Sequence, residues 1–81
     1  MKSFTREELN FADRKTRAKF IAENPNEGFS GRNDKGELVY VGVGKDGEGM
    51  VVKTQHPEKP NWWECVEYDK DGLQVSVSYE R

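Results

Sequence analysis

The sequence has few of the residues that build disulfides, metal sites or membrane spans. Its 81 residues include one cysteine, Cys65, and one histidine, His56. A single cysteine excludes an intramolecular disulfide, so nothing indicates an oxidising compartment. No apolar run approaches the roughly 20 residues of a transmembrane helix, and the N-terminus lacks the apolar stretch of a signal peptide. We therefore expect a cytoplasmic protein.

The scarcity of reactive side chains also argues against catalysis. Metal sites usually need several ligands, and neither a Cys-x-x-Cys nor a His-x-x-x-His spacing occurs. Cys65 and His56 are nominally a nucleophile and a base, but a small apolar side chain filling a sheet position is the simpler interpretation of Cys65. Gly42-Val43-Gly44 lacks the following helix that a phosphate-binding loop requires. We predict a protein that is not an enzyme and that needs no cofactor and no metal.

Length and composition allow one domain with a thin core. Apolar residues make up 33% of the chain and charged residues 35%, while four Phe, three Tyr and two Trp are the largest side chains. A chain of this size buries only about 60% of the surface that its unfolded form exposes, so these aromatics must supply most of the core. We expect a single domain over residues 1–81. A thin core also favours a tight partner or self-association.

The N-terminal segment carries a strong helix-start signal. Thr5 and Glu8 have the spacing of a capping box, in which each side chain accepts a hydrogen bond from the backbone amide of the other residue. Phe4 and Leu9 flank this box at the spacing of a hydrophobic staple. These features together predict that a helix begins directly after Thr5.

A stop signal follows at Asn24-Pro25, because the residue before proline is pushed out of the helical region. The two signals predict one helix over about residues 6–23. Helical spacing then places one apolar row toward the sheet, and its members are Leu9, Ala12, Thr16 and Phe20. Phe11 falls on roughly the opposite side of that helix, where it is either buried by the N-terminal segment or exposed as a contact residue.

Turn signals divide the rest of the chain into strand-like segments. Asn or Asp precedes glycine in 33–36, 45–47 and 69–72, and these residues suit the positive φ of tight turns. The segments with strand character are Phe29–Arg32, Glu37–Val43, Met50–Gln55, Trp62–Tyr68 and Leu73–Tyr79. We predict an α+β fold, with one N-terminal α-helix packed on a four- to five-stranded antiparallel β-meander over about residues 28–80.

The last two segments carry more detailed predictions. Trp62–Tyr68 would place bulky residues on both of its faces, which favours a central strand over an edge strand. The final segment alternates polar residues with apolar ones, which predicts one buried and one solvent-exposed face. Its apolar residues are Leu73, Val75, Val77 and Tyr79. Because adjacent strand residues point to opposite faces, we expect one of Trp62 and Trp63 in the core and the other facing outward.

An outward tryptophan beside prolines and carboxylates has the composition of a protein-binding hot spot. The alternative is that the cross-strand residue Tyr40 or the end of the chain covers this tryptophan. We predict a partner-binding surface that comprises Trp62, Trp63, Glu58, Glu64, Glu67, Asp69 and Asp71.

Charge is distributed unevenly along the chain. Residues 1–20 hold six Lys or Arg against three Asp or Glu, and residues 21–81 hold seven against twelve, so a basic start precedes an acidic remainder within a net charge of −2. Four cations of the predicted helix are candidate phosphate contacts, namely Arg14, Lys15, Arg17 and Lys19. Because these cations fan around the helix and the chain is acidic overall, nucleic-acid binding ranks second to protein binding.

In its small size, acidity and α+β pattern without catalytic residues, the chain resembles the intracellular proteins with which viruses of bacteria block host enzymes and defence complexes, including anti-CRISPR proteins. The resemblance implies a phage-type inhibitor that acts by steric and electrostatic occlusion of a larger protein. Its acidic residues Glu64, Glu67, Asp69 and Asp71 would then oppose a basic groove of the target. A third interpretation is a structural subunit that completes its core as a homodimer.

Overall fold

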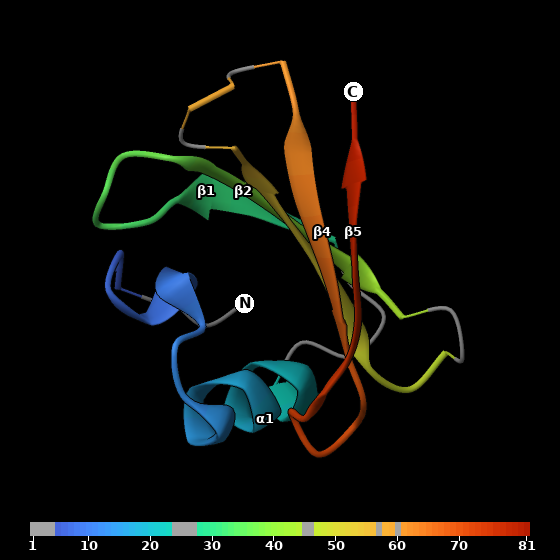
Figure 1. The fold of residues 1–81 in the computed structure, drawn as a ribbon. Coiled ribbons are helices and arrows are strands. Elements are labelled where there is room, and N and C mark those ends of the chain that lie inside the picture. The colour runs from blue at the N-terminus through green and yellow to red at the C-terminus, as the bar shows by residue number, and fades with distance from the viewer. Residues whose placement is uncertain (1–4, 24–27, 45–46, 57, 60) are drawn as a thin grey trace.

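The computed structural model describes residues 5–23, 28–44, 47–56, 58–59 and 61–81. The elements, in chain order, are the 3-10 helix η1 (Glu8–Asn10), the helix α1 (Arg14–Glu23) and the strands β1 (Phe29–Arg32), β2 (Leu38–Val43), β3 (Met50–Gln55), β4 (Trp63–Tyr68) and β5 (Gln74–Glu80). The strands form one antiparallel sheet in the order β1-β2-β3-β4-β5. Figure 1 shows α1 against one side of this sheet. The fold is therefore α+β, and β4 is an interior strand, as its bulky residues predict.

The capping box forms, but it opens a shorter helix than the sequence predicts. The amide of Thr5 donates to the Glu8 carboxylate at 3.0 Å, and the amide of Glu8 donates to the Thr5 hydroxyl at 3.1 Å. These bonds start only the three residues of η1, so the prediction of one helix over residues 6–23 is wrong. Phe4 of the predicted staple and the predicted stop at Asn24-Pro25 lie outside the described residues.

The helix breaks at Phe11, and a second cap starts it again. Phe11 has a φ of 51°, in the left-handed region that ends η1. Two residues later, the Asp13 carboxylate accepts a hydrogen bond from the Thr16 amide at 2.8 Å, the geometry of a helix N-cap. That bond also lowers the pKa of the Asp13 carboxyl, so the cap is lost as the pH falls through this pKa. The restart fixes the beginning of α1 at Arg14.

The break changes which side chains enter the core. Phe11 is only 2% exposed and meets Phe20 edge-to-face, with 5.2 Å between the ring centroids. Ala12, predicted to face the sheet, is exposed instead, because the turn at Phe11 abolishes the helical spacing that linked Leu9 to Ala12. The core consists of Leu9, Phe11, Phe20, Val39, Val41, Met50, Val52, Val66 and Tyr68.

The predicted glycine turns are confirmed, and one of them contacts the helix. Gly36, Gly47 and Gly72 have φ values of 80°, 78° and 81°. At Gly72, in the turn between β4 and β5, a Cβ atom would lie 2.8 Å from the carbonyl oxygen of Arg14 and 3.0 Å from the amide nitrogen of Ala18. The turn therefore packs directly on the backbone of α1, and Figure 1 shows the two side by side.

The prediction that β5 has one buried and one exposed face is wrong, because all seven of its residues are exposed. The register places Val77 opposite Val66 and Tyr79 opposite Glu64, so the alternation assigns these side chains to the face that carries the core. The buried cluster nevertheless ends at β4. Alternation identified the strand and its apolar side, but it contained no information about what covers that side.

Replacing Gly72 by alanine tests the contact between the turn and α1. Both Gly36→Ala and Gly72→Ala force alanine into the left-handed region, which costs about 1–2 kcal/mol. Only Gly72→Ala also drives a methyl group into helix backbone, because nothing lies within 4 Å of a Cβ at Gly36. We expect Gly72→Ala to lower the free energy of unfolding by about 1–3 kcal/mol more than Gly36→Ala does. Equal urea denaturation midpoints for the two variants would contradict the contact.

Candidate functional site

No described helix covers the sheet face opposite α1. The strand register aligns Tyr40, Lys53, Cys65 and Ser78 across β2 to β5, and their side chains point away from the core because neighbouring residues such as Val52 and Val66 point into it. We call this surface the helix-free face. Its residues on β2 to β5 include Tyr40, Gly42, Val51, Lys53, Trp63, Cys65, Glu67, Ser76, Ser78 and Glu80.

An open hollow of about 570 Å³ lies on the helix-free face. Small residues line much of it, including Gly42, Ser76 and Ser78. A Cβ atom at Gly42 would have no atom within 4 Å. The volume falls within the range of ligand pockets. Only the strand register shows that this space opens beside small residues of β5.

Trp63 and Tyr40 form an aromatic pair on this face. Their ring centroids lie 5.4 Å apart with an angle of 61° between the rings, an edge-to-face geometry that is favourable for aromatic pairs. Tyr40 is 46% exposed and Trp63 is partly buried. Tyr40 therefore supports Trp63 from the side while both rings keep a solvent-facing surface. A rigid, partly exposed aromatic pair is typical of protein-binding hot spots.

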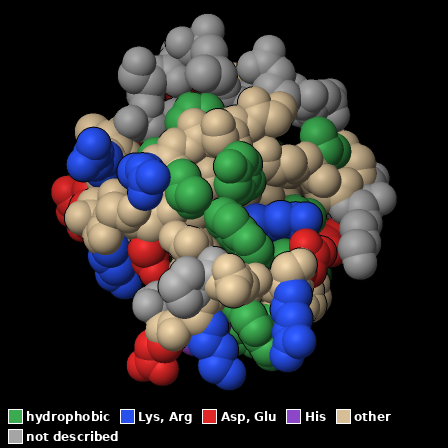
Figure 2. Space-filling model, turned by 90° about the horizontal axis from the view of Figure 1, so that it is seen from above, with side chains coloured by type: hydrophobic (Ala, Val, Ile, Leu, Met, Phe, Trp, Pro, Cys, Tyr) green, Lys and Arg blue, Asp and Glu red, His purple; other side chains and the backbone are tan. Residues whose placement is uncertain are grey.

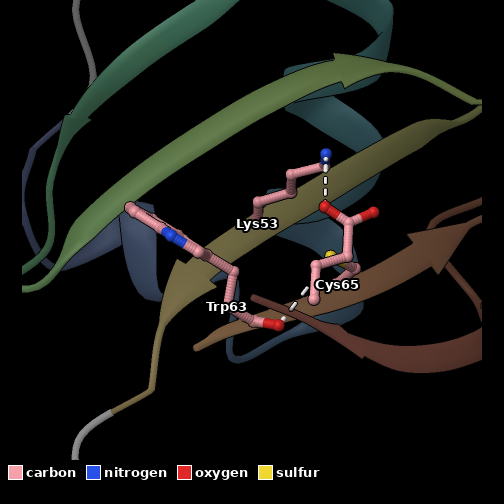
Figure 3. Close-up of polar contacts among 4 residues, drawn as sticks. Lys53, Trp63 and Cys65 are labelled. Carbon is pink, nitrogen blue, oxygen red and sulfur yellow. Dashed lines mark hydrogen bonds and ion pairs between the residues drawn. The ribbon is translucent and has the colours of Figure 1, made fainter. Parts of the chain in front are cut away.

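An ion pair bridges the same face above the only cysteine. The Lys53 ammonium on β3 lies 3.0 Å from the Glu80 carboxylate on β5, and Cys65 lies on the strand between them. Figure 3 shows Lys53, Trp63 and Cys65 on these neighbouring strands. The hydrogen bond to Glu80 raises the pKa of Lys53, and burial raises the pKa of the Cys65 thiol. Cys65 is only 6% exposed, so its thiol is protected although no helix covers it.

The predicted acidic residues do not form one patch. Glu67 lies on the helix-free face, whereas Glu64 lies on the opposite face and accepts a hydrogen bond from the Tyr79 hydroxyl at 3.4 Å. Asp69 accepts bonds from the amides of Asp71 and Leu73 at 2.9 and 3.0 Å, so its carboxylate stabilises the turn between β4 and β5. Asp71 is exposed in that turn. The predicted acidic residues are thus distributed over three places, which are the two faces of the sheet and the turn between β4 and β5.

Neither tryptophan enters the buried core, so the prediction of one inward tryptophan is wrong. Trp62 precedes β4, and the cations of Lys59 and Arg81 lie 4.7 and 4.8 Å from the centre of its ring. These cation–π contacts hold the indole partly buried at the end of the sheet. Glu58, also predicted to bind a partner, is exposed in the preceding loop, and its amide donates to His56 Nδ1 at 3.2 Å.

Seen from above the orientation of Figure 1, the molecule shows hydrophobic side chains near the middle of the surface, with Lys or Arg and Asp or Glu beside them (Figure 2). The strand register places charges of both signs on the helix-free face, with Lys53 on β3, Glu67 on β4 and Glu80 on β5. This surface therefore presents an aromatic and apolar centre with charges of both signs, instead of the single acidic field that the sequence suggested.

Two of the four cations proposed to contact nucleic acid are engaged within the protein. Arg17 donates to the carbonyl oxygens of Gly72 at 2.8 Å and Phe11 at 3.0 Å, and its guanidinium carbon lies 4.6 Å from the centre of the Tyr68 ring. Arg14 donates to the carbonyl oxygen of Asp71 at 3.1 Å. Lys15 and Lys19, the other two cations, are exposed. The arginines therefore attach α1 to the turn between β4 and β5.

Substitution of Arg17 tests this attachment. Arg17→Ala removes two charge-assisted hydrogen bonds and a cation–π contact, so we expect the free energy of unfolding to fall by about 1.5–3 kcal/mol. Arg17→Lys should restore little, because an ammonium lacks the fork that reaches both carbonyl groups. Lys15→Ala serves as the control and should leave the denaturation curve unchanged. A loss in Lys15→Ala equal to that in Arg17→Ala would contradict the assigned role.

The chemical pairings considered for catalysis are not assembled. The His56 ring lies 6.0 Å from the Tyr79 ring, centroid to centroid, and Tyr79 belongs to the face opposite the one that carries Cys65. Among the described residues, no group of three or more His, Cys, Asp or Glu side chains is arranged to hold a metal ion. The same residues contain no helix long and apolar enough to cross a membrane.

Comparison of the chain with protein-family models, with curated proteins and with solved structures gives no match.

Proposed function

We propose that this protein is a non-enzymatic binding module that engages a larger protein through its helix-free face. The observation that carries the proposal is the combination of the Trp63–Tyr40 pair with the open hollow beside Gly42. An aromatic pair offers a large apolar contact at small conformational cost, and an adjacent hollow accepts a side chain of the partner. The phage-type inhibitory role implied by the resemblance is the specific form of this function that we propose.

The chemistry of the face defines the partner surface that would fit. An apolar or aromatic side chain of the partner fills the hollow, while polar groups at its edge meet the Lys53–Glu80 ion pair. These two side chains are 43% and 55% exposed, so they favour orientation and association rate more than affinity. The mechanism we propose is steric coverage of the target. Electrostatic attraction or repulsion contributes little, because the acidic residues are divided between different surfaces. A reducing cytoplasm, which keeps Cys65 a thiol, is the proposed location.

Nucleic-acid binding receives less support. Arg14 and Arg17 already bind backbone carbonyl groups, so a phosphate contact through them would have to replace bonds that hold α1 in place. Lys15 and Lys19 alone provide little charge for a salt-resistant contact with nucleic acid.

Three variants separate a binding role of the helix-free face from a structural one. Trp63→Ala removes the aromatic contact with Tyr40. Gly42→Phe places a phenyl ring in the hollow, because a Cβ atom at residue 42 has no atom within 4 Å. Trp62→Ala is the matched control, because it removes an indole that is also partly buried but precedes β4 and contacts Lys59 and Arg81 at the end of the sheet. We expect all three to keep wild-type far-UV circular dichroism and cooperative melting, since none of these residues belongs to the core.

Binding is then measured by immobilising the wild-type chain, capturing a partner from a bacterial lysate, and titrating the purified partner against each variant. We expect Trp63→Ala and Gly42→Phe to weaken binding at least about thirtyfold, the equivalent of about 2 kcal/mol for a hot spot. Trp62→Ala should bind within a few-fold of wild type. Wild-type affinity in both Trp63→Ala and Gly42→Phe would exclude the helix-free face as the binding surface.

A further inference from the structure

β5 is an edge strand with an unusual amount of exposed apolar surface. Val75, Val77 and Tyr79 are 61%, 49% and 52% exposed. They alternate along one side of the strand, and we call them the β5 stripe. Isolated exposed apolar residues are ordinary, but a contiguous row on an unpaired edge marks an interaction surface. The stripe lies on the opposite side of the sheet from the hollow, so the binding role proposed above does not account for it.

The two edges of the sheet differ in their protection. β1 has four residues, includes Gly31 and ends in Arg32, and short or charged edge strands resist pairing with another chain. β5 has seven residues, contains no proline or lysine, and carries a single charge at Glu80. Its outer edge offers backbone donors and acceptors along the strand, whose pairing with β4 is regular from Ser76 to Glu80 and shifts by one residue at Val75. Of the two edges, β5 is the less protected, because the register shift at Val75 is its one irregularity and the strand is long and nearly uncharged.

The sequence of β5 is complementary to itself in the antiparallel direction. The one antiparallel register that pairs all seven residues of two β5 strands is centred on Val77. In it Val75 lies opposite Tyr79 and Ser76 opposite Ser78, so β-branched residues meet an aromatic ring and hydroxyl groups meet hydroxyl groups. Glu80 lies opposite the neutral amide of Gln74. No like charges face each other, and no charge faces an apolar side chain.

We propose that this protein forms a homodimer in which the β5 strands of two copies pair antiparallel about a two-fold axis through Val77. Such an axis runs perpendicular to the sheet and keeps equivalent faces on the same side. The β5 stripes of the two copies then lie next to each other and cover each other's exposed side. The two sheets become continuous, and a Val77 from each copy meets at the centre.

The same pairing has a consequence for the helix-free faces. Because equivalent faces stay on one side, the two hollows would lie on one continuous surface. A partner with repeated or symmetric sites would then meet two binding positions at once, which raises apparent affinity without any new contact. The dimer itself does not depend on the proposed binding function, since it uses the strand edge and the opposite side of the sheet.

Sedimentation velocity over a concentration series from micromolar to millimolar tests the dimer. We expect the wild-type chain to convert from monomer to a species of twice its mass. Val77→Lys places two ammonium groups across the axis and should leave only monomer, with the fold retained because Val77 is about half exposed. Val43→Lys is the matched control: Val43 is 40% exposed but lies on β2, so this variant should dimerise like wild type. A wild-type monomer at every concentration would overturn the proposal, as would dimerisation of Val77→Lys with wild-type affinity.

Cysteine cross-linking tests the register in a Cys65→Ser background. Directly opposed residues of antiparallel strands have Cα separations that a disulfide can bridge. Val77→Cys should therefore form a disulfide-linked dimer by itself under mild oxidation. Val75→Cys and Tyr79→Cys should each stay monomeric on reducing-agent-free gels when oxidised alone, and should cross-link when mixed. Efficient self-linking of Val75→Cys, or none by Val77→Cys, would refute pairing centred on Val77.

Discussion

The constraint on which the rest of this structure depends is that one short helix must cover a sheet of five strands. α1 has 10 residues, which makes it about 15 Å long, while five strands at about 4.8 Å spacing span about 19 Å between the outer two. A helix of this size covers part of one face only. As a direct result, no helix in the described part of the chain covers the opposite face, and the residues of the outer strand β5 stay exposed. Both proposed interaction surfaces therefore result from the small size of α1 relative to the sheet.

The position of α1 decides which part of the sheet it covers. Phe11, by turning the chain into the left-handed region, places its own ring against Phe20 and sets the direction in which α1 restarts. At the other end of the contact, Arg17 binds the carbonyl of Gly72 and lies over Tyr68. Gly72 has no side chain, so the turn approaches the helix backbone closely. These contacts fix α1 beside the start of β5, and the buried cluster ends before the rest of that strand.

Sequence patterns predict the turns and strands well, but they predict poorly which faces of the strands are buried. The glycine turns, the strands and the capping box are encoded by neighbouring residues, and each forms as expected. Phe11 is buried, which is one of the two alternatives for it, but the continuous helix predicted around it is wrong. The N-cap at Asp13 competes with that helix, and nearby residues alone do not show which of the two forms. The alternation predicts that Val75 and Val77 are buried, and both are exposed. Alternation shows which side chains share one face of a strand, but it does not show whether a helix is long enough to cover that face. The contact of Tyr40 with Trp63 is one of the alternatives that the sequence offers. Lys53 and Glu80 join this face only through long-range register, so sequence spacing does not reveal them.

Hydroxyl-radical footprinting of the three tyrosines tests the central claim that α1 covers only part of the sheet. They share one chemistry and occupy three places: Tyr68 in the core, Tyr40 on the helix-free face and Tyr79 on the β5 stripe, with exposures of 7%, 46% and 52%. In dilute protein the account predicts rapid oxidation of Tyr40 and Tyr79 and protection of Tyr68. At high concentration, Tyr79 alone should gain protection. Comparable oxidation of Tyr68 and Tyr40, or protection of Tyr40 in the dilute chain, would contradict the account.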